Sequence, residues 1–76
     1  MDIKQLTEFV KYQAEMVQKW AGDQHLREAF YYQGQGAINC ALLYCGVDPK
    51  EIDVLEKWYQ QNAGVIVFPW LENEVG

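Results

Sequence analysis

The alternation of hydrophobic and polar positions predicts a first helix over residues 3–21. Apolar residues recur there at the three- and four-residue spacing of one helix face, and charged residues of alternating sign fill the opposite face. Asp2 precedes this segment as an N-cap acid, and Gly22 follows it as a stop signal. The pattern is typical of a helix that covers a core on one side and faces solvent on the other.

Two further helices are predicted over residues 24–33 and 37–45, separated by a break in the sequence QGQG. Gly34 and Gly36 each cost about 1 kcal/mol relative to Ala inside a helix, and they point to nearly opposite sides of a helical wheel, which favours a break over a packing groove. The segment AINCALLYCG is apolar around its whole circumference except at Asn39. A helix without a polar face needs cover on every side, so this segment is a first indication of an oligomer.

The sequence GVDP predicts a sharp turn into a last helix over residues 49–62. Gly46 suits the left-handed position that ends a helix, Asp48 suits the next N-cap, and Pro49 suits the first helical position. Gly64 is expected to end this helix.

The segment after Gly64 has the β-branched and aromatic content of a strand and predicts extended backbone over residues 65–70, with a frayed end over residues 72–76. Because no second strand is predicted, its backbone groups need other partners. The segment could lie across the helices, add to a sheet edge of another protein, or pair with its own copy in a second chain. The last alternative is preferred, and the expected oligomer strand is Val65, Ile66, Val67 and Phe68. The predicted fold is therefore mainly α: a single small domain over residues 1–76, with three to four helices and one short C-terminal extended or β segment.

Charge narrows the range of partners. The net charge is −5, with five acids against four bases over residues 1–46 and six against two over residues 47–76. The chain has no basic cluster, so neither nucleic acid nor an anionic membrane surface is expected as a partner. No apolar run is long enough to span a bilayer, and no signal-peptide pattern is present. Two cysteines in such a chain suggest free thiols in a reducing cytoplasm.

The residue inventory argues against catalysis. The chain contains no serine and a single histidine, His25, whose spacing from the cysteines does not suggest a nucleophile–base pair. Cys40 and Cys45 are five residues apart on an expected helix, so they face different directions and should be buried free thiols that share neither a disulfide nor a metal ion. We expect no enzyme activity, no cofactor and no metal.

These observations favour a non-catalytic protein-binding module, a small stoichiometric inhibitor or adaptor of the kind encoded by phages or mobile elements. It would act as a homo-oligomer, most simply a homodimer, on a larger protein. Three Trp, five Tyr and three Phe are many for so small a core, and aromatic residues dominate binding hot spots. The expected contact residues are Tyr31, Tyr32, Trp58, Tyr59 and Trp70.

The alternative is an oligomer that binds or sequesters a small ligand in an aromatic and glutamine-lined pocket. The expected lining residues are Tyr32, Gln33, Gln35 and Asn39. Mimicry of DNA by an acidic surface is a weaker third hypothesis, because lysines alternate with the acids of the first helix.

Overall fold

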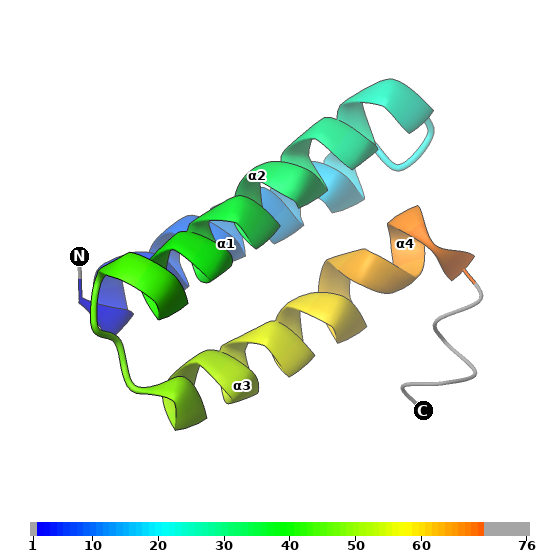
Figure 1. Ribbon diagram of the computed structural model, residues 1–76. Coiled ribbons are helices and arrows are strands. Elements are labelled where there is room, and N and C mark those ends of the chain that lie inside the picture. The colour runs from blue at the N-terminus through cyan, green and yellow to red at the C-terminus, as the bar shows by residue number, and fades with distance from the viewer. Residues whose placement is uncertain (1, 70–76) are drawn as a thin grey trace.

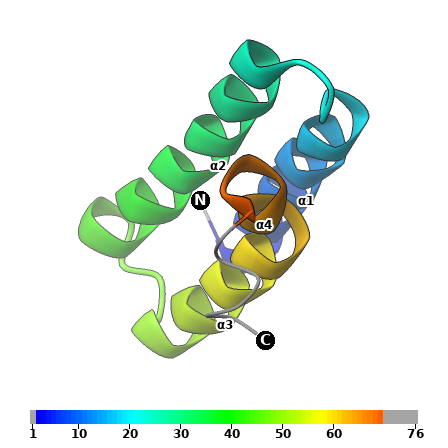
Figure 2. The ribbon, with the colours of Figure 1, turned by 90° about the vertical axis from the view of Figure 1, so that its right-hand side faces the viewer.

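The computed structural model describes residues 2–69, and these residues fold into three main helices with a short helical extension (Figure 1). The elements are α1 (Ile3–Lys19), α2 (Gln24–Tyr44), α3 (Pro49–Tyr59), a π-helical turn (Gln60–Gly64) and α4 (Val65–Val67). Helices α1 and α2 form an antiparallel hairpin. Helix α3 runs back in the direction of α1 and packs on one side of that hairpin (Figures 1 and 2). The mainly helical prediction is confirmed.

Helix α1 begins as the sequence predicts and ends slightly earlier, at Lys19. The backbone N–H of Gln5 donates to the Asp2 carboxylate at 2.8 Å, and the Asp2 N–H donates back to the Gln5 side-chain oxygen at 3.2 Å. This reciprocal pair is a capping box, which satisfies two backbone donors at the helix start.

Helix α2 is continuous, so the predicted break at QGQG is wrong. Gly34 is buried against the ring of Tyr59, and a Cβ added there would lie 2.9 Å from Tyr59 Cε2 and closer still to the end of the ring. The phenol of Tyr59 donates to the backbone oxygens of Tyr31 at 2.9 Å and Phe30 at 3.2 Å. The missing side chain therefore makes room for a ring that fastens α3 to α2, and this packing compensates for the weak helix propensity of glycine.

The turn between α2 and α3 has the predicted form. Gly46 adopts a left-handed φ of +68°. The Asp48 carboxylate accepts a hydrogen bond from the Lys50 N–H at 2.9 Å, and Pro49 is the first residue of α3.

The helical backbone continues through Gly64 into α4, which differs from the predicted extended segment at residues 65–67. Burial prevails over β propensity here, because Val67 is 5% exposed and packs into the core. The Phe68 N–H donates to the Gly64 oxygen at 2.7 Å, so this backbone group is satisfied within the chain. Phe68 leaves the helix with φ −125° and ψ 84° because it precedes Pro69, which disfavours helical backbone at the residue before it.

Residues 2–69 contain no β-strand. Of the expected oligomer strand, Val65, Ile66 and Val67 are helical in the single chain, and Phe68 lies just beyond the helix. Trp70, the rest of the expected extended segment and the expected frayed end at 72–76 lie outside the described residues.

The core lies where the three main helices meet. Its fully buried large side chains are Tyr59, Leu6, Ile38, Ile52, Val10 and Val17. Tyr59 stacks on Tyr31 with ring centroids 5.0 Å apart, and Phe68 meets Tyr31 edge-on at 5.7 Å. These ring contacts join α2 to α3 and to the residue that follows α4.

Candidate functional site

The expected aromatic contact residues separate into core and surface positions. Tyr59 and Tyr31 are 0% and 5% exposed, so their rings are part of the core and are not accessible to a partner. Tyr32 is 54% exposed on α2, and Trp58 is half-buried on α3. Trp70 lies beyond the described residues. Only Tyr32 and Trp58 remain as contact candidates within residues 2–69.

Burial determines the protonation of the two core tyrosines. It raises the pKa of the Tyr59 phenol well above its ordinary value of about 10, and the neighbouring Tyr31 adds to this effect. The pKa of Tyr31 is also raised, first by burial and then by the negative charge of Glu56 and by Tyr32. Both phenols are thus neutral at physiological pH; the Tyr59 hydroxyl serves as a hydrogen-bond donor, and both rings serve as packing groups.

The expected ligand-binding residues do not all lie on one side of α2. Tyr32, Gln35 and Asn39 follow one another at three- and four-residue spacing on one side of α2, whereas Gln33 faces another side. The Gln35 side-chain nitrogen donates to Glu56 on α3 at 3.4 Å. These residues form part of the α2 surface and of its contact with α3.

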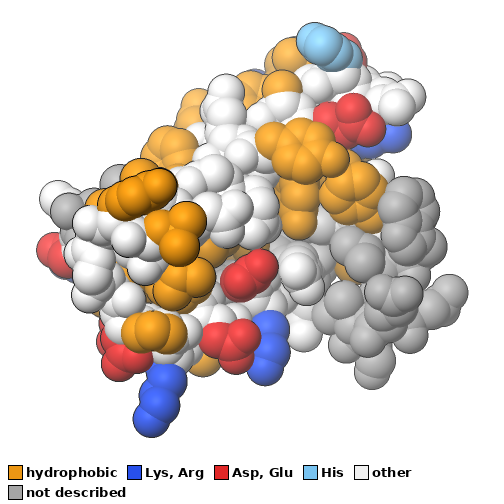
Figure 3. All heavy atoms as spheres, viewed as in Figure 1, with side chains coloured by type: hydrophobic (Ala, Val, Ile, Leu, Met, Phe, Trp, Pro, Cys, Tyr) orange, Lys and Arg blue, Asp and Glu red, His pale blue; other side chains and the backbone are white. Residues whose placement is uncertain are grey.

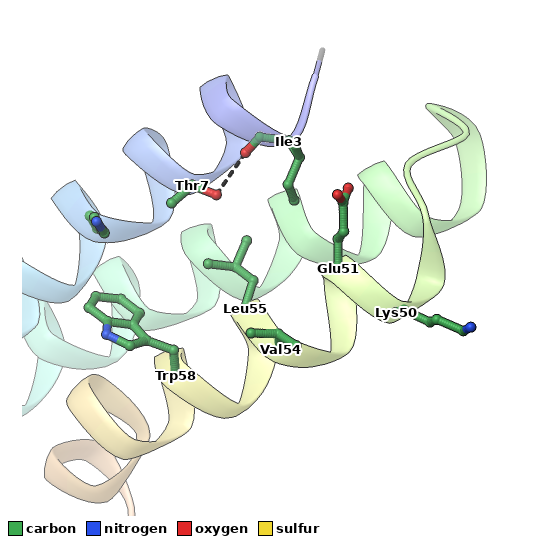
Figure 4. Close-up of a pocket in the computed structure, with 8 residues that line it drawn as sticks. Ile3, Thr7, Lys50, Glu51, Val54, Leu55 and Trp58 are labelled. Atoms are coloured by element: carbon green, nitrogen blue, oxygen red, sulfur yellow. Dashed lines mark hydrogen bonds between the residues drawn. The ribbon is translucent and has the colours of Figure 1, made fainter.

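A groove of about 550 Å³ lies between α1 and α3 instead (Figure 4). We call it the α1–α3 groove; its lining residues are Ile3, Thr7, Lys11, Lys50, Glu51, Val54, Leu55 and Trp58. The lining residues of α1 are spaced four apart, and those of α3 fall on one helical face. Each helix therefore presents one row of side chains to the groove. In the close-up, Ile3 and Leu55 point into the space between the helices, and Lys50 points away from it.

The groove is apolar inside and charged at its edges. Ile3, Val54, Leu55 and Trp58 provide the apolar surface, and Val54 is 69% exposed. The Thr7 hydroxyl donates to the Ile3 backbone oxygen at 2.7 Å, so its hydrogen is engaged within α1. The charged lining residues are Lys11, Lys50 and Glu51. This arrangement suits an apolar group.

Of the residues that line this groove, sequence reasoning predicted only Trp58 as a contact residue. The helical spacing of residues 49–62 places Val54, Leu55 and Trp58 on one apolar arc, which is the available signal. Thr7 and Lys11 were assigned to no site, because the pattern along a chain does not show which helix lies beside which.

Hydrophobic side chains also reach the surface over the end of α2 (Figure 3). Leu43 and Tyr44 are 68% and 82% exposed. Cys40 and Cys45 are free thiols at the surface, so the expectation that they are buried is wrong. They emerge because two neighbouring helices cover only part of the circumference of α2.

Searches of the described part of the chain find no group of three His, Cys, Asp or Glu side chains placed to hold a metal ion. None of the helices within residues 2–69 is long and apolar enough to cross a membrane.

Comparison with known proteins gives no match to a family model, to a curated protein or to a solved structure.

Proposed function

We propose that this chain is a non-catalytic protein-binding module that holds apolar side chains of a larger protein in the α1–α3 groove. It would act stoichiometrically, as an inhibitor or adaptor, in the cytoplasm. The observation that supports this proposal is a groove of about 550 Å³ whose apolar surface includes the exposed Val54 and the half-buried Trp58. An origin in a phage or mobile element remains a prediction from the general character of the chain.

The energetics favour these two side chains as contacts. Val54 is 69% exposed, so its burial by a partner would contribute on the order of 1 kcal/mol. Trp58 presents a large rigid surface at little cost in side-chain entropy, which is why tryptophan is enriched in binding hot spots. Because α3 and α1 position both walls, the groove is formed before the partner arrives.

The charges at the edge indicate which partner segment fits best. Lys11 and the outward-pointing Lys50 stand against the single acid Glu51, so the edge of the groove, but not its interior, carries one excess positive charge on a chain whose net charge is −5. A partner segment with apolar side chains flanked by Asp or Glu would be attracted to these lysines and would approach fastest at low salt.

Co-purification tests the proposal. The tagged chain, expressed in the cells that naturally produce it, is expected to retain one other protein in stoichiometric amount. Val54→Lys introduces a charge into the apolar surface and should abolish that retention. Gln61→Lys is the matched control, because it adds the same charge at an exposed position outside the groove. Equal retention by both variants, or the absence of any stoichiometric protein, would contradict the proposal.

The volume of the groove favours a second candidate function, the binding of a small apolar molecule, because ligand sites typically measure about 300–1,000 Å³. A ligand that binds the native chain raises its melting temperature by mass action. A panel of small carboxylated apolar compounds should then stabilise the wild type and Gln61→Lys but not Val54→Lys. If no compound shifts the melting temperature while a protein co-purifies, the second candidate is excluded.

A further inference from the structure

One side of the α1–α2 hairpin carries no covering helix within residues 2–69. Helix α3 packs on the other side (Figures 1 and 2). At about 100° per residue, the α1 positions that flank the core on the side away from the α1–α3 groove are Phe9, Tyr12 and Met16. The corresponding positions of α2 include Phe30, Cys40 and Tyr44. We call these six residues the hairpin face.

The side chains of the hairpin face are substantially open to solvent. Phe9 and Tyr12 are 39% and 53% exposed, and Tyr44 is 82% exposed. Cys40 is also exposed, whereas Met16 and Phe30 are half-buried against neighbouring side chains. Three large aromatic rings in such positions form a surface of the kind that marks an interaction site.

The spacing of the face identifies the geometry of its occupant. On α1, the steps from Gln5 to Phe9, Tyr12 and Met16 are four, three and four residues. On α2, the alternation of three and four runs through Phe30, Gln33, Ala37, Cys40 and Tyr44. This is the repeat by which helices pack against helices in bundles and coiled coils. Two such stripes on antiparallel helices fit a second pair of antiparallel helices.

The distribution of charge indicates that a second copy of this chain can occupy the hairpin face. Neither stripe contains a charged residue, and residues 29–44 of α2 contain none at all. Two identical faces can therefore meet without like-charge repulsion. Within the described residues, residues 47–69 carry four acids against two bases. Contact through the hairpins places the α3 helices of two chains on opposite outer sides, where the repulsion between these acids is weakest.

The available area is sufficient for a weak specific dimer. An aromatic side chain presents about 150–250 Å², so the exposed parts of the hairpin face supply on the order of 500 Å² per chain. Two chains would bury about 1,000 Å², which reaches the lower limit for a specific interface.

We propose that the hairpin face binds the hairpin face of a second copy of this chain, giving a symmetric dimer whose centre is a four-helix bundle. This contact uses none of the residues of the α1–α3 groove and is independent of the function proposed for that groove. It also replaces the strand pairing that the sequence suggested for residues 65–68, since Val65–Val67 is helical.

Sedimentation equilibrium of the whole chain, from about 1 to 500 µM, tests the proposal. The wild type should be a dimer with a dissociation constant in the micromolar range. Tyr12→Lys and Tyr44→Lys each place a charge in the hairpin face at an exposed position, and each should raise the dissociation constant at least tenfold. Gln61→Lys should leave it unchanged.

Far-ultraviolet circular dichroism should show the same helix content in all four proteins, because the substituted side chains are outside the core. A wild type that is monomeric throughout this range would overturn the proposal, as would hairpin-face variants that dimerise as tightly as Gln61→Lys. Because Val54 lies outside the hairpin face, failure of this test leaves the groove experiment unaffected, and the converse also holds.

Discussion

Gly34 and Tyr59 are the pair of residues on which the packing of α3 against α2 depends most directly. The absent side chain of Gly34 leaves space for the ring, and the ring places its hydroxyl on two backbone oxygens of α2. Gly36 lies two residues further along the same helix, and a Cβ there would have no neighbour within 4 Å. Identical residues about half a turn apart therefore have opposite roles.

The two glycines give a matched prediction. Gly34→Ala should destabilise the protein by about 1–3 kcal/mol, because the added methyl group overlaps a fully buried ring. Gly36→Ala should stabilise it by up to about 1 kcal/mol through higher helix propensity. Urea denaturation of both variants measures the two free energies of unfolding. If both substitutions change the free energy of unfolding in the same direction, the close contact with Tyr59 is not the reason for a glycine at position 34.

The raised pKa of Tyr59 predicts a loss of stability in alkali. The folded protein retains the phenolic proton more strongly than the unfolded chain does, so the stabilisation is complete below the unfolded pKa of about 10 and decreases as the pH rises above it. Tyr59→Phe removes both hydrogen bonds and should cost about 0.5–1.5 kcal/mol at neutral pH. It should also flatten the decline in stability above pH 10. An equally steep decline in the variant would assign the alkaline effect to other groups.

At the scale of elements, the turn between α2 and α3 was predictable because each of its residues has a strong local preference. Asp48→Ala removes the cap of α3 and should cost about 1 kcal/mol. Gly46→Val forces a β-branched residue to a φ of +68° and should cost about 1–2 kcal/mol or more. Thermal or urea unfolding measures both effects. Neutral results for both variants would mean that the turn contributes little to stability.

The other element boundaries were less predictable because contacts distant in sequence decide them. The break at QGQG and the strand at VIVF are both sound interpretations of local propensity. Packing of Tyr59 on Gly34 compensates for the low helix propensity of QGQG, so α2 stays continuous there. Burial of Val67 keeps the chain helical up to Phe68. At Phe68 a local preference again determines the backbone conformation, because the following Pro69 disfavours helical backbone at the residue before it.

In the whole molecule, the apolar side chains that remain exposed are those that no neighbouring helix covers. Phe9 belongs to the apolar spacing over residues 3–21 that predicts a buried helix face, but it is 39% exposed, whereas Gln13 is 3% exposed. The buried arc of α1, which faces α2, α3 and the π-helical turn, centres on Leu6, Val10 and Val17, and Gln13 falls within it. The α1–α3 groove and the hairpin face both arise from this incomplete coverage, which periodicity along a single chain does not reveal.

Two separate surfaces on one small chain predict a defined assembly, in which the hairpin face joins two copies and each copy presents its groove to a partner. Added salt should weaken the groove contact, because lysines at its edge attract the partner, and should affect the uncharged hairpin face much less. Sedimentation of the wild type alone at about 50 mM and 500 mM salt should give nearly the same dimer dissociation constant. A dimer that dissociates at the higher salt would place charged residues in the contact.

Native mass spectrometry of the affinity-purified complex determines whether the α1–α3 groove binds another protein. The predicted result is a complex of the chain with one other protein in equal numbers. It should be present for the wild type and for Gln61→Lys and absent for Val54→Lys. Recovery of the chain without a stoichiometric partner, or a complex that persists unchanged in Val54→Lys, would contradict binding in the groove.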